Sequence, residues 1–95
     1  MKIEYDPVKS EKNISDRGLS FELASGFGFN TALIVEDTRQ DYGEQRYQAL
    51  GHIDNRLYAL VFTPRGSVVR VISLRKANAR EVKSYEKNTK SRIDR

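Results

Sequence analysis

The sequence predicts an α+β domain, within the broad α/β class, built from a short strand, two helices, a four-stranded antiparallel meander and a C-terminal helix. Three observations support this fold class. Helix-capping residues flank the first segments, β-branched and apolar residues then dominate four short segments, and a new capping pattern precedes the last segment. The turns between the four strand segments are short, which favours antiparallel neighbours over crossover units.

The opening strand and the first helix meet at an Asp-Pro pair. Ile3 and Tyr5 alternate with polar neighbours, as in a brief strand. Asp6 can accept hydrogen bonds from free backbone N–H groups as the N-cap, and Pro7 fits the first helical position because no donor is needed there. Gly18 can adopt the left-handed conformation that ends a helix, so we expect the first helix to end there.

A second, shorter helix is expected to begin at Ser20 and to give way to a loop in the glycine-rich residues 26–29. The pattern then changes to that of strands. The four predicted strands cover residues 32–36, 46–53, 57–63 and 68–74. Asn78 as N-cap and Glu81 at the third helical position form a variant of the capping box, which predicts the start of the last helix.

Length and composition limit the function classes. The 95 residues suffice for one domain, expected over residues 1–88, followed by a flexible basic tail over residues 89–95. The chain has no cysteine and a single histidine, His52, so we expect no disulfide, metal site or cofactor, and we interpret His52 as a surface or turn residue. The N-terminus lacks the apolar run of a signal peptide, and no segment is long enough to span a membrane, which predicts a cytoplasmic protein.

Charge is divided unevenly along the chain. Residues 1–45 contain five Lys or Arg against nine Asp or Glu, whereas residues 46–95 contain twelve against four. Positive potential concentrated in the C-terminal half raises the local concentration of an anionic ligand, and nucleic acid or an acidic protein fits this best. The plain alternative is a solvated basic surface.

The most informative basic segment covers residues 65–81, where cations occur at a turn, within an apolar strand and at the exit of that strand. Arginine within a run of Val, Ile and Leu is costly to bury unless it meets a partner or an anion. Regular strand alternation places Arg70 on the same face as Leu74 and places Arg75 on the opposite face.

Several short blocks, in order from about Tyr5 to Tyr85, carry a family resemblance. The blocks are Glu4-Tyr5-Asp6-Pro7, Asn13 followed by Gly18, Ser20-Phe21-Glu22, Glu36-Asp37-Thr38, Tyr42-Gly43-Glu44-Gln45-Arg46, Ala49-Leu50-Gly51, Phe62-Thr63-Pro64-Arg65-Gly66 and Arg70-Val71-Ile72-Ser73-Leu74-Arg75-Lys76-Ala77. This ordered set resembles the BrnT toxins, the ribonuclease halves of bacterial type II toxin-antitoxin pairs.

The resemblance implies a fold related to the RelE-like toxins, RNA cleavage without a metal, and neutralisation by a BrnA-type antitoxin with a ribbon-helix-helix DNA-binding domain. Contact with operator DNA would then occur only through the antitoxin, and the ribosome is a further possible partner. One position departs from the family pattern, because relatives usually carry Lys-His-Gly where this chain has Asp16-Arg17-Gly18. A guanidinium, with a pKa above about 12, cannot replace a histidine as acid or base, although Arg17 can hold a phosphate.

RNA cleavage of this kind needs cations that stabilise a dianionic phosphorane as the 2′-hydroxyl attacks phosphorus. Planar guanidinium groups match phosphate oxygens, so Arg46 and Arg75 are the preferred candidates, followed by Arg65. Further RNA contacts are expected from Arg17, Arg70, Lys76, Arg80 and Lys83. For Arg70 the alternative is an ion pair with a carboxylate such as Glu44 or Glu81.

Proton transfer has fewer candidates. Glu44 can act as the base if it is partly desolvated, and Tyr85 can act as the acid. The alternative for Glu44 is an ion pair with a neighbouring arginine, and the alternative for Tyr85 is an anchor in the core beside Val82.

Two hypotheses from different classes therefore remain open. The preferred one is a metal-independent endoribonuclease toxin that inhibits translation and growth. The other is a RelE-like binding module with weak or no catalysis, which acts with its antitoxin as a DNA-bound autorepressor. The Asp16-Arg17 departure keeps the second hypothesis open.

Overall fold

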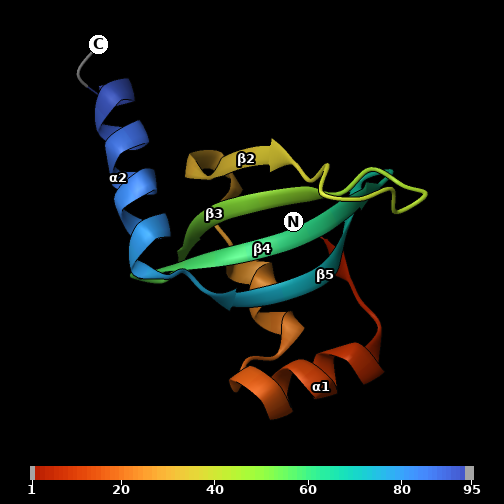
Figure 1. Ribbon diagram of the computed structural model, residues 1–95. Helices are drawn as coiled ribbons and strands as arrows, with labels where there is room; N and C mark the ends of the chain where they lie inside the picture. The colour runs from red at the N-terminus through yellow and green to blue at the C-terminus, as the bar shows by residue number, and fades with distance from the viewer. Residues whose placement is uncertain (1, 94–95) are drawn as a thin grey trace.

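A five-stranded sheet with the strand order β1-β5-β4-β3-β2 forms the centre of the protein (Figure 1). The computed structural model describes the backbone of residues 2–93 and the side chains of residues 2–89. The strands are β1 (Ile3–Glu4), β2 (Leu33–Glu36), β3 (Tyr47–Ile53), β4 (Arg56–Arg65) and β5 (Val68–Lys76). Strands β2 to β5 form an antiparallel meander, which confirms the predicted fold class, and β1 adds a fifth strand parallel to β5.

The first helix, α1 (Pro7–Arg17), has the predicted caps. The Asp6 side chain accepts a hydrogen bond from the Val8 backbone N–H, and Gly18 takes the left-handed conformation with φ of 72°. The helix predicted at Ser20 is instead a 3-10 helix, η1 (Phe21–Gly26), followed by a shorter one, η2 (Phe29–Thr31). Ser20 is nevertheless its N-cap, because its hydroxyl accepts from the Glu22 N–H.

The last helix, α2 (Ala79–Ile93), begins with the predicted capping box. The Asn78 side chain accepts from the Glu81 N–H at 2.8 Å, and the Glu81 carboxylate accepts from the Asn78 N–H at 2.9 Å. The helix continues past Asn88, where we expected it to end. Residues 94–95 lie outside the described part of the chain, and the flexible tail over residues 89–95 stays a prediction.

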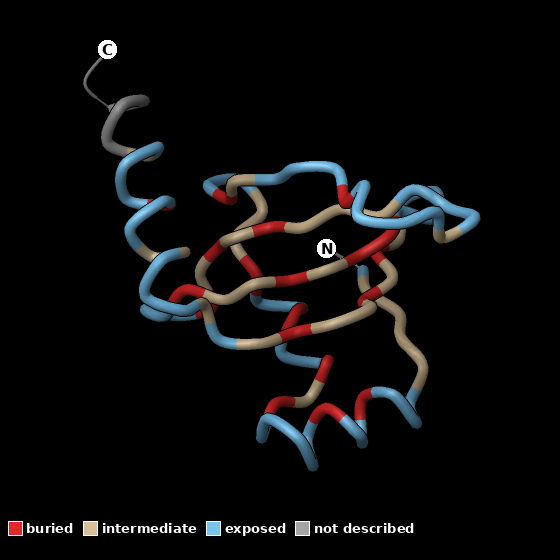
Figure 2. The backbone as a smooth tube through the Cα atoms, in the orientation of Figure 1, coloured by how far each residue is buried: buried red, intermediate tan, exposed pale blue. Residues whose placement is uncertain are grey.

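One face of the sheet, which we call the covered face, packs against α1 and η1 and holds the core (Figures 1 and 2). Leu60 and Leu74 are fully buried there, and Phe21 of η1 packs beside them in the same cluster. Gly51 lets this layer approach the sheet closely, because a Cβ atom at that position would lie 2.5 Å from the Phe27 ring.

The predicted alternation of side chains along β5 is wrong beyond Val71, because the strand contains a β-bulge. Phe62 pairs with Val71 but Val61 pairs with Ser73, so Ile72 is an extra residue in β5. Before the bulge Val71 faces the core, and after it Leu74 does. As a result, Arg70 and Arg75 share the other face of the sheet, which we call the open face, rather than lying on opposite faces.

Side chains of α1 complete the outer edge of β5. Within residues 2–93, strand β1 pairs with Val69 and Arg70 alone, so the described edge beyond them has no strand partner. The Asn13 amide donates to the carbonyl oxygens of Leu19 and Leu74 at 2.8 and 3.0 Å, and Arg17 follows it one turn later. This arrangement covers a sheet edge and carries Arg17 around toward the open face.

Candidate functional site

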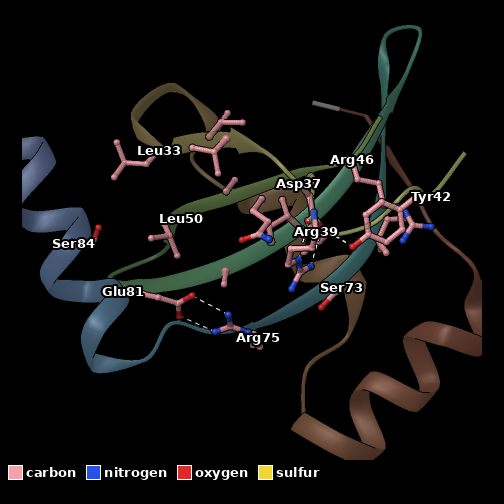
Figure 3. Close-up of a pocket in the computed structure, with 18 of the residues that line it drawn as sticks. Leu33, Asp37, Arg39, Tyr42, Arg46, Leu50, Ser73, Arg75, Glu81 and Ser84 are labelled. Atoms are coloured by element: carbon pink, nitrogen blue, oxygen red, sulfur yellow. Dashed lines mark hydrogen bonds and ion pairs between the residues drawn. The ribbon is translucent and has the colours of Figure 1, made fainter. Parts of the chain in front are cut away.

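A hollow of about 570 Å³ lies on the open face, between the β2–β3 segment and α2 (Figure 3). Apolar side chains of three strands form its floor, namely Leu33, Val35, Leu50, Ala59 and Val61. The first turns of α2 contribute polar groups at one end, Glu81, Ser84 and Asn88. Such a floor with a polar rim is typical of a ligand site.

Among the residues that the structure describes, four arginines line this hollow. Arg17 comes from α1, Arg39 from the β2–β3 loop, Arg46 from the position just before β3, and Arg75 from the end of β5. The Arg17 guanidinium lies 3.2 Å from the Ser73 hydroxyl, so the position at which the family resemblance led us to expect a histidine does reach the hollow. Arg17, Arg46 and Arg75 were predicted as site residues, and the structure brings them together with Arg39.

Arg75 is held by Glu81 in a two-pronged ion pair. Its two terminal nitrogens donate to the two carboxylate oxygens at 2.7 and 2.8 Å. The hydrogen bonds from Arg75 lower the pKa of Glu81, and the same bonds raise the pKa of Arg75. Glu81 therefore has two functions, since it caps α2 and fixes the guanidinium of Arg75.

Asp37 organises the opposite wall of the hollow. Its carboxylate is almost fully buried, with 1% of the side chain exposed, and it accepts from Arg39 Nε and Nη2, both at 2.8 Å. The Tyr42 hydroxyl also donates to it at 3.2 Å. The hydrogen bonds from Arg39 hold the pKa of Asp37 well below its usual range and raise the pKa of Arg39.

Glu44 lies just outside the hollow, between two arginines. It accepts from Arg46 Nε at 3.0 Å and lies 3.6 Å from Arg65 Nη2. The Arg46 guanidinium also lies over the Tyr42 ring, 4.2 Å from its centre. The structure thus groups Glu44, Arg46 and Arg65, although only Arg46 lines the hollow itself.

Other predicted site residues lie elsewhere. Tyr85 is buried, and its hydroxyl donates to the Thr31 carbonyl at 2.8 Å. This placement fits the alternative in which Tyr85 is an anchor in the core rather than a catalytic acid. Arg70 forms an ion pair at 3.7 Å with Glu4 of β1, not with Glu44 or Glu81. The remaining predicted RNA contacts are exposed and lie outside the hollow, at Lys76, Arg80 and Lys83.

His52 also lies outside the hollow. Its ring packs edge-on against Tyr85, with 5.2 Å between ring centres, and it belongs to β3 rather than to a turn. No group of three His, Cys, Asp or Glu side chains within the described residues is arranged to hold a metal ion. No helix in the described part of the chain is long and apolar enough to cross a membrane.

Sequence reasoning assigned no role to Asp37, Arg39 or Tyr42, because their segment looks like a polar loop. The one available signal was the spacing of Asp37 and Arg39. An aspartate in a loop often accepts from the residue two positions later, and Asp37 accepts from both the backbone and the side chain of Arg39.

The mixed sheet, with its antiparallel meander, and the arginine-lined hollow define a small α+β domain with a site suited to anionic ligands. Comparison with protein families is more specific. Residues 5–81 match the family described as "Ribonuclease toxin, BrnT, of type II toxin-antitoxin system". The chain belongs to this family of BrnT ribonuclease toxins, whose members act on RNA and are paired with an antitoxin.

Comparisons with curated proteins and with solved structures gave no match. The relationship to RelE-like toxins therefore stays a prediction.

Proposed function

We propose that this toxin is a metal-independent endoribonuclease that cleaves RNA in the hollow on the open face and thereby inhibits translation and growth in the cytoplasm. The observation that carries the proposal is the convergence of Arg17, Arg39, Arg46 and Arg75 on one hollow. Guanidinium groups in a partly enclosed site stabilise the negative charge that develops on the phosphate oxygens when the 2′-hydroxyl attacks phosphorus.

The proposed reaction begins with removal of the 2′-hydroxyl proton. The oxygen then attacks the adjacent phosphorus, the bond to the 5′-oxygen breaks, and that oxygen takes up a proton from the protonated base or from water. The products are a 2′,3′-cyclic phosphate and a 5′-hydroxyl end. We assign Arg46 and Arg75 to the phosphate oxygens, with Arg65 beside them. Glu44 is the candidate base, because binding of a phosphate by Arg46 and Arg65 would release its carboxylate from both ion pairs.

The same hollow supports a proposal for the antitoxin. Its apolar floor and cationic rim fit an acidic amphipathic segment, which would exclude RNA by occupying the arginines. We propose that this partner is a BrnA-type antitoxin, through whose ribbon-helix-helix domain the pair would reach operator DNA.

Cleavage of purified RNA tests the proposed activity. The toxin should cut naked RNA in the presence of EDTA, and its induced expression should arrest growth. Parallel reactions with added ribosomes separate a free nuclease from a ribosome-dependent one. Cleavage that EDTA abolishes, and that added Mg²⁺ restores, would contradict the metal-independent mechanism.

A binding module with weak catalysis is the second candidate function. One observation favours it: each carboxylate at the site is paired with an arginine, at Asp37, Glu44 and Glu81. Such a protein would bind RNA and antitoxin but leave RNA intact with and without ribosomes.

A further inference from the structure

Two arginines from distant parts of the chain point into the same hollow. Arg39 comes from the loop after β2, and Arg75 comes from the end of β5 (Figure 3). Sequence reasoning selected Arg75 and overlooked Arg39. The structure pairs each of the two side chains with a carboxylate.

Each guanidinium is fixed by one carboxylate through two hydrogen bonds. Asp37 binds Nε and Nη2 of Arg39, and Glu81 binds both terminal nitrogens of Arg75. Both carboxylates are in turn tied to the backbone. The Asp37 carboxylate accepts from the Arg39 backbone N–H at 3.3 Å, and the Glu81 carboxylate accepts from the Asn78 backbone N–H at 2.9 Å.

Arg39 keeps donors that Asp37 does not use. A guanidinium has five N–H groups, and the contacts to Asp37 occupy one side of it. The side chain remains 66% exposed although its partner is buried. A long side chain that is held in place yet accessible loses little further freedom when it binds a ligand, which favours affinity.

The two guanidinium groups line the same hollow, and their like charges repel each other. The positive charge of Arg39 acts to lower the pKa of Arg75, although the hydrogen bonds from Glu81 outweigh it and raise that pKa overall. Like charges that face one hollow favour an anion bound between them. The apolar floor of the same hollow suits a ribose or a base next to the phosphate.

We propose that Arg39 and Arg75 form a two-armed clamp for one phosphodiester group of the RNA strand, with Asp37 and Glu81 as the positioning residues of the two arms. This inference rests on the proposed function for the identity of the ligand. It adds a binding residue, Arg39, and gives buried Asp37 a role that depends on Arg39.

The test uses the full chain and a short RNA with 2′-O-methyl groups, which cannot be cleaved because the nucleophile is blocked. Binding is measured by fluorescence anisotropy over a range of salt concentrations, and cleavage is measured separately on unmodified RNA. The variants are Arg39→Ala and Asp37→Asn, alone and combined. Lys9→Ala is the matched control, because Lys9 is an exposed cation of α1, which packs on the covered face.

Arg39→Ala should lower kcat/KM on the order of 100-fold. It should also reduce the slope of log K against log salt by about 0.7, the value for one lost phosphate contact on a single strand. Lys9→Ala should leave both quantities unchanged. Asp37→Asn should lower kcat/KM about 10-fold when Arg39 is present. It should have no further effect in the Arg39→Ala protein, because a positioning residue acts only through the group that it positions.

The outcomes separate this inference from the proposed function. If the normal protein cleaves RNA and Arg39→Ala behaves like Lys9→Ala, the clamp is wrong and the nuclease proposal stands. If the normal protein binds the 2′-O-methyl RNA in an Arg39-dependent way but cleaves nothing, the clamp stands and the nuclease proposal fails. Equal losses from Asp37→Asn in both backgrounds would overturn the positioning role of Asp37.

Discussion

The two faces of the sheet differ in what they bury. On the covered face, Leu60 and Leu74 have no exposed surface, and aromatic side chains of η1 and the following loop close the layer. On the open face, an apolar floor is left accessible and is surrounded by arginines that are paired with carboxylates. Stability should therefore depend chiefly on the covered face, and RNA binding chiefly on the open face.

Truncation of the core gives the largest expected effect. Leu60→Ala should lower the free energy of unfolding by about 2–5 kcal/mol, because it leaves a cavity in a fully buried layer. Val35→Ala is the matched truncation on the open face and should change the same quantity by less than about 0.5 kcal/mol, since Val35 is 63% exposed. Urea denaturation followed by circular dichroism measures both, and similar losses for the two variants would refute the contrast between the faces.

Removal of a site arginine should give the reverse pattern. Arg75→Ala should lower kcat/KM for RNA on the order of 100-fold, because a donor to the phosphate is lost. Its free energy of unfolding should change by less than about 1 kcal/mol, since the pair with Glu81 is partly exposed. Arg75→Lys keeps the charge but loses the planar guanidinium group. Its kcat/KM should therefore lie between that of the unchanged protein and that of Arg75→Ala.

Asn13 connects the two faces and should have a smaller effect on stability than Leu60. Its amide satisfies the Leu19 and Leu74 carbonyls, and its oxygen accepts from Arg17. Asn13→Ala should lower the free energy of unfolding by about 1–3 kcal/mol, because buried carbonyls lose their donor. Lys12→Ala, at an exposed position of the same helix, should lower the free energy of unfolding by less than about 0.5 kcal/mol. Thermal denaturation compares the two variants, and equal shifts in Tm would contradict this role of Asn13.

Acid should weaken the ion pairs of the open face, and this is the smallest expected effect. The arginines lower the pKa values of Asp37 and Glu81 in the folded protein, so the unfolded chain binds more protons at acidic pH. The stabilisation is present above the unfolded pKa values, near 4, and is lost as the pH falls through the lower folded values. Tm measured from about pH 6 to pH 3 should decline, and it should decline less steeply in Asp37→Asn.

Local patterns in the sequence were sufficient to predict where the helices begin. The caps at Asp6, Ser20 and Asn78 act within a few residues of themselves, so their signals survive in any tertiary context. The meander also followed from short turns and β-branched runs. The 3-10 form of η1 did not follow, because an N-cap marks where a helical turn begins and not which helical form continues.

Part of the site was also accessible from the sequence. Arg46 and Arg75 were selected because planar guanidinium groups match phosphate oxygens, and both line the hollow. Tyr85 was placed at the site on its chemistry alone, whereas packing of α2 directs its hydroxyl to Thr31. Arg39 was overlooked because its fixed orientation depends on Asp37, whose burial cannot be read from a polar segment.

The sequence by itself determined the fold class, the capping residues, the family resemblance and the cationic character of the C-terminal half. These properties depend on composition and on neighbours along the chain. Only the tertiary structure decided which arginines share one hollow. The extra residue in β5 reverses the alternation after Val71, and the long-range pairing of strands brings Arg39 and Arg75 together on the open face. A side chain's face is set by register with distant strands, and a single inserted residue changes it while the local sequence pattern remains that of a strand.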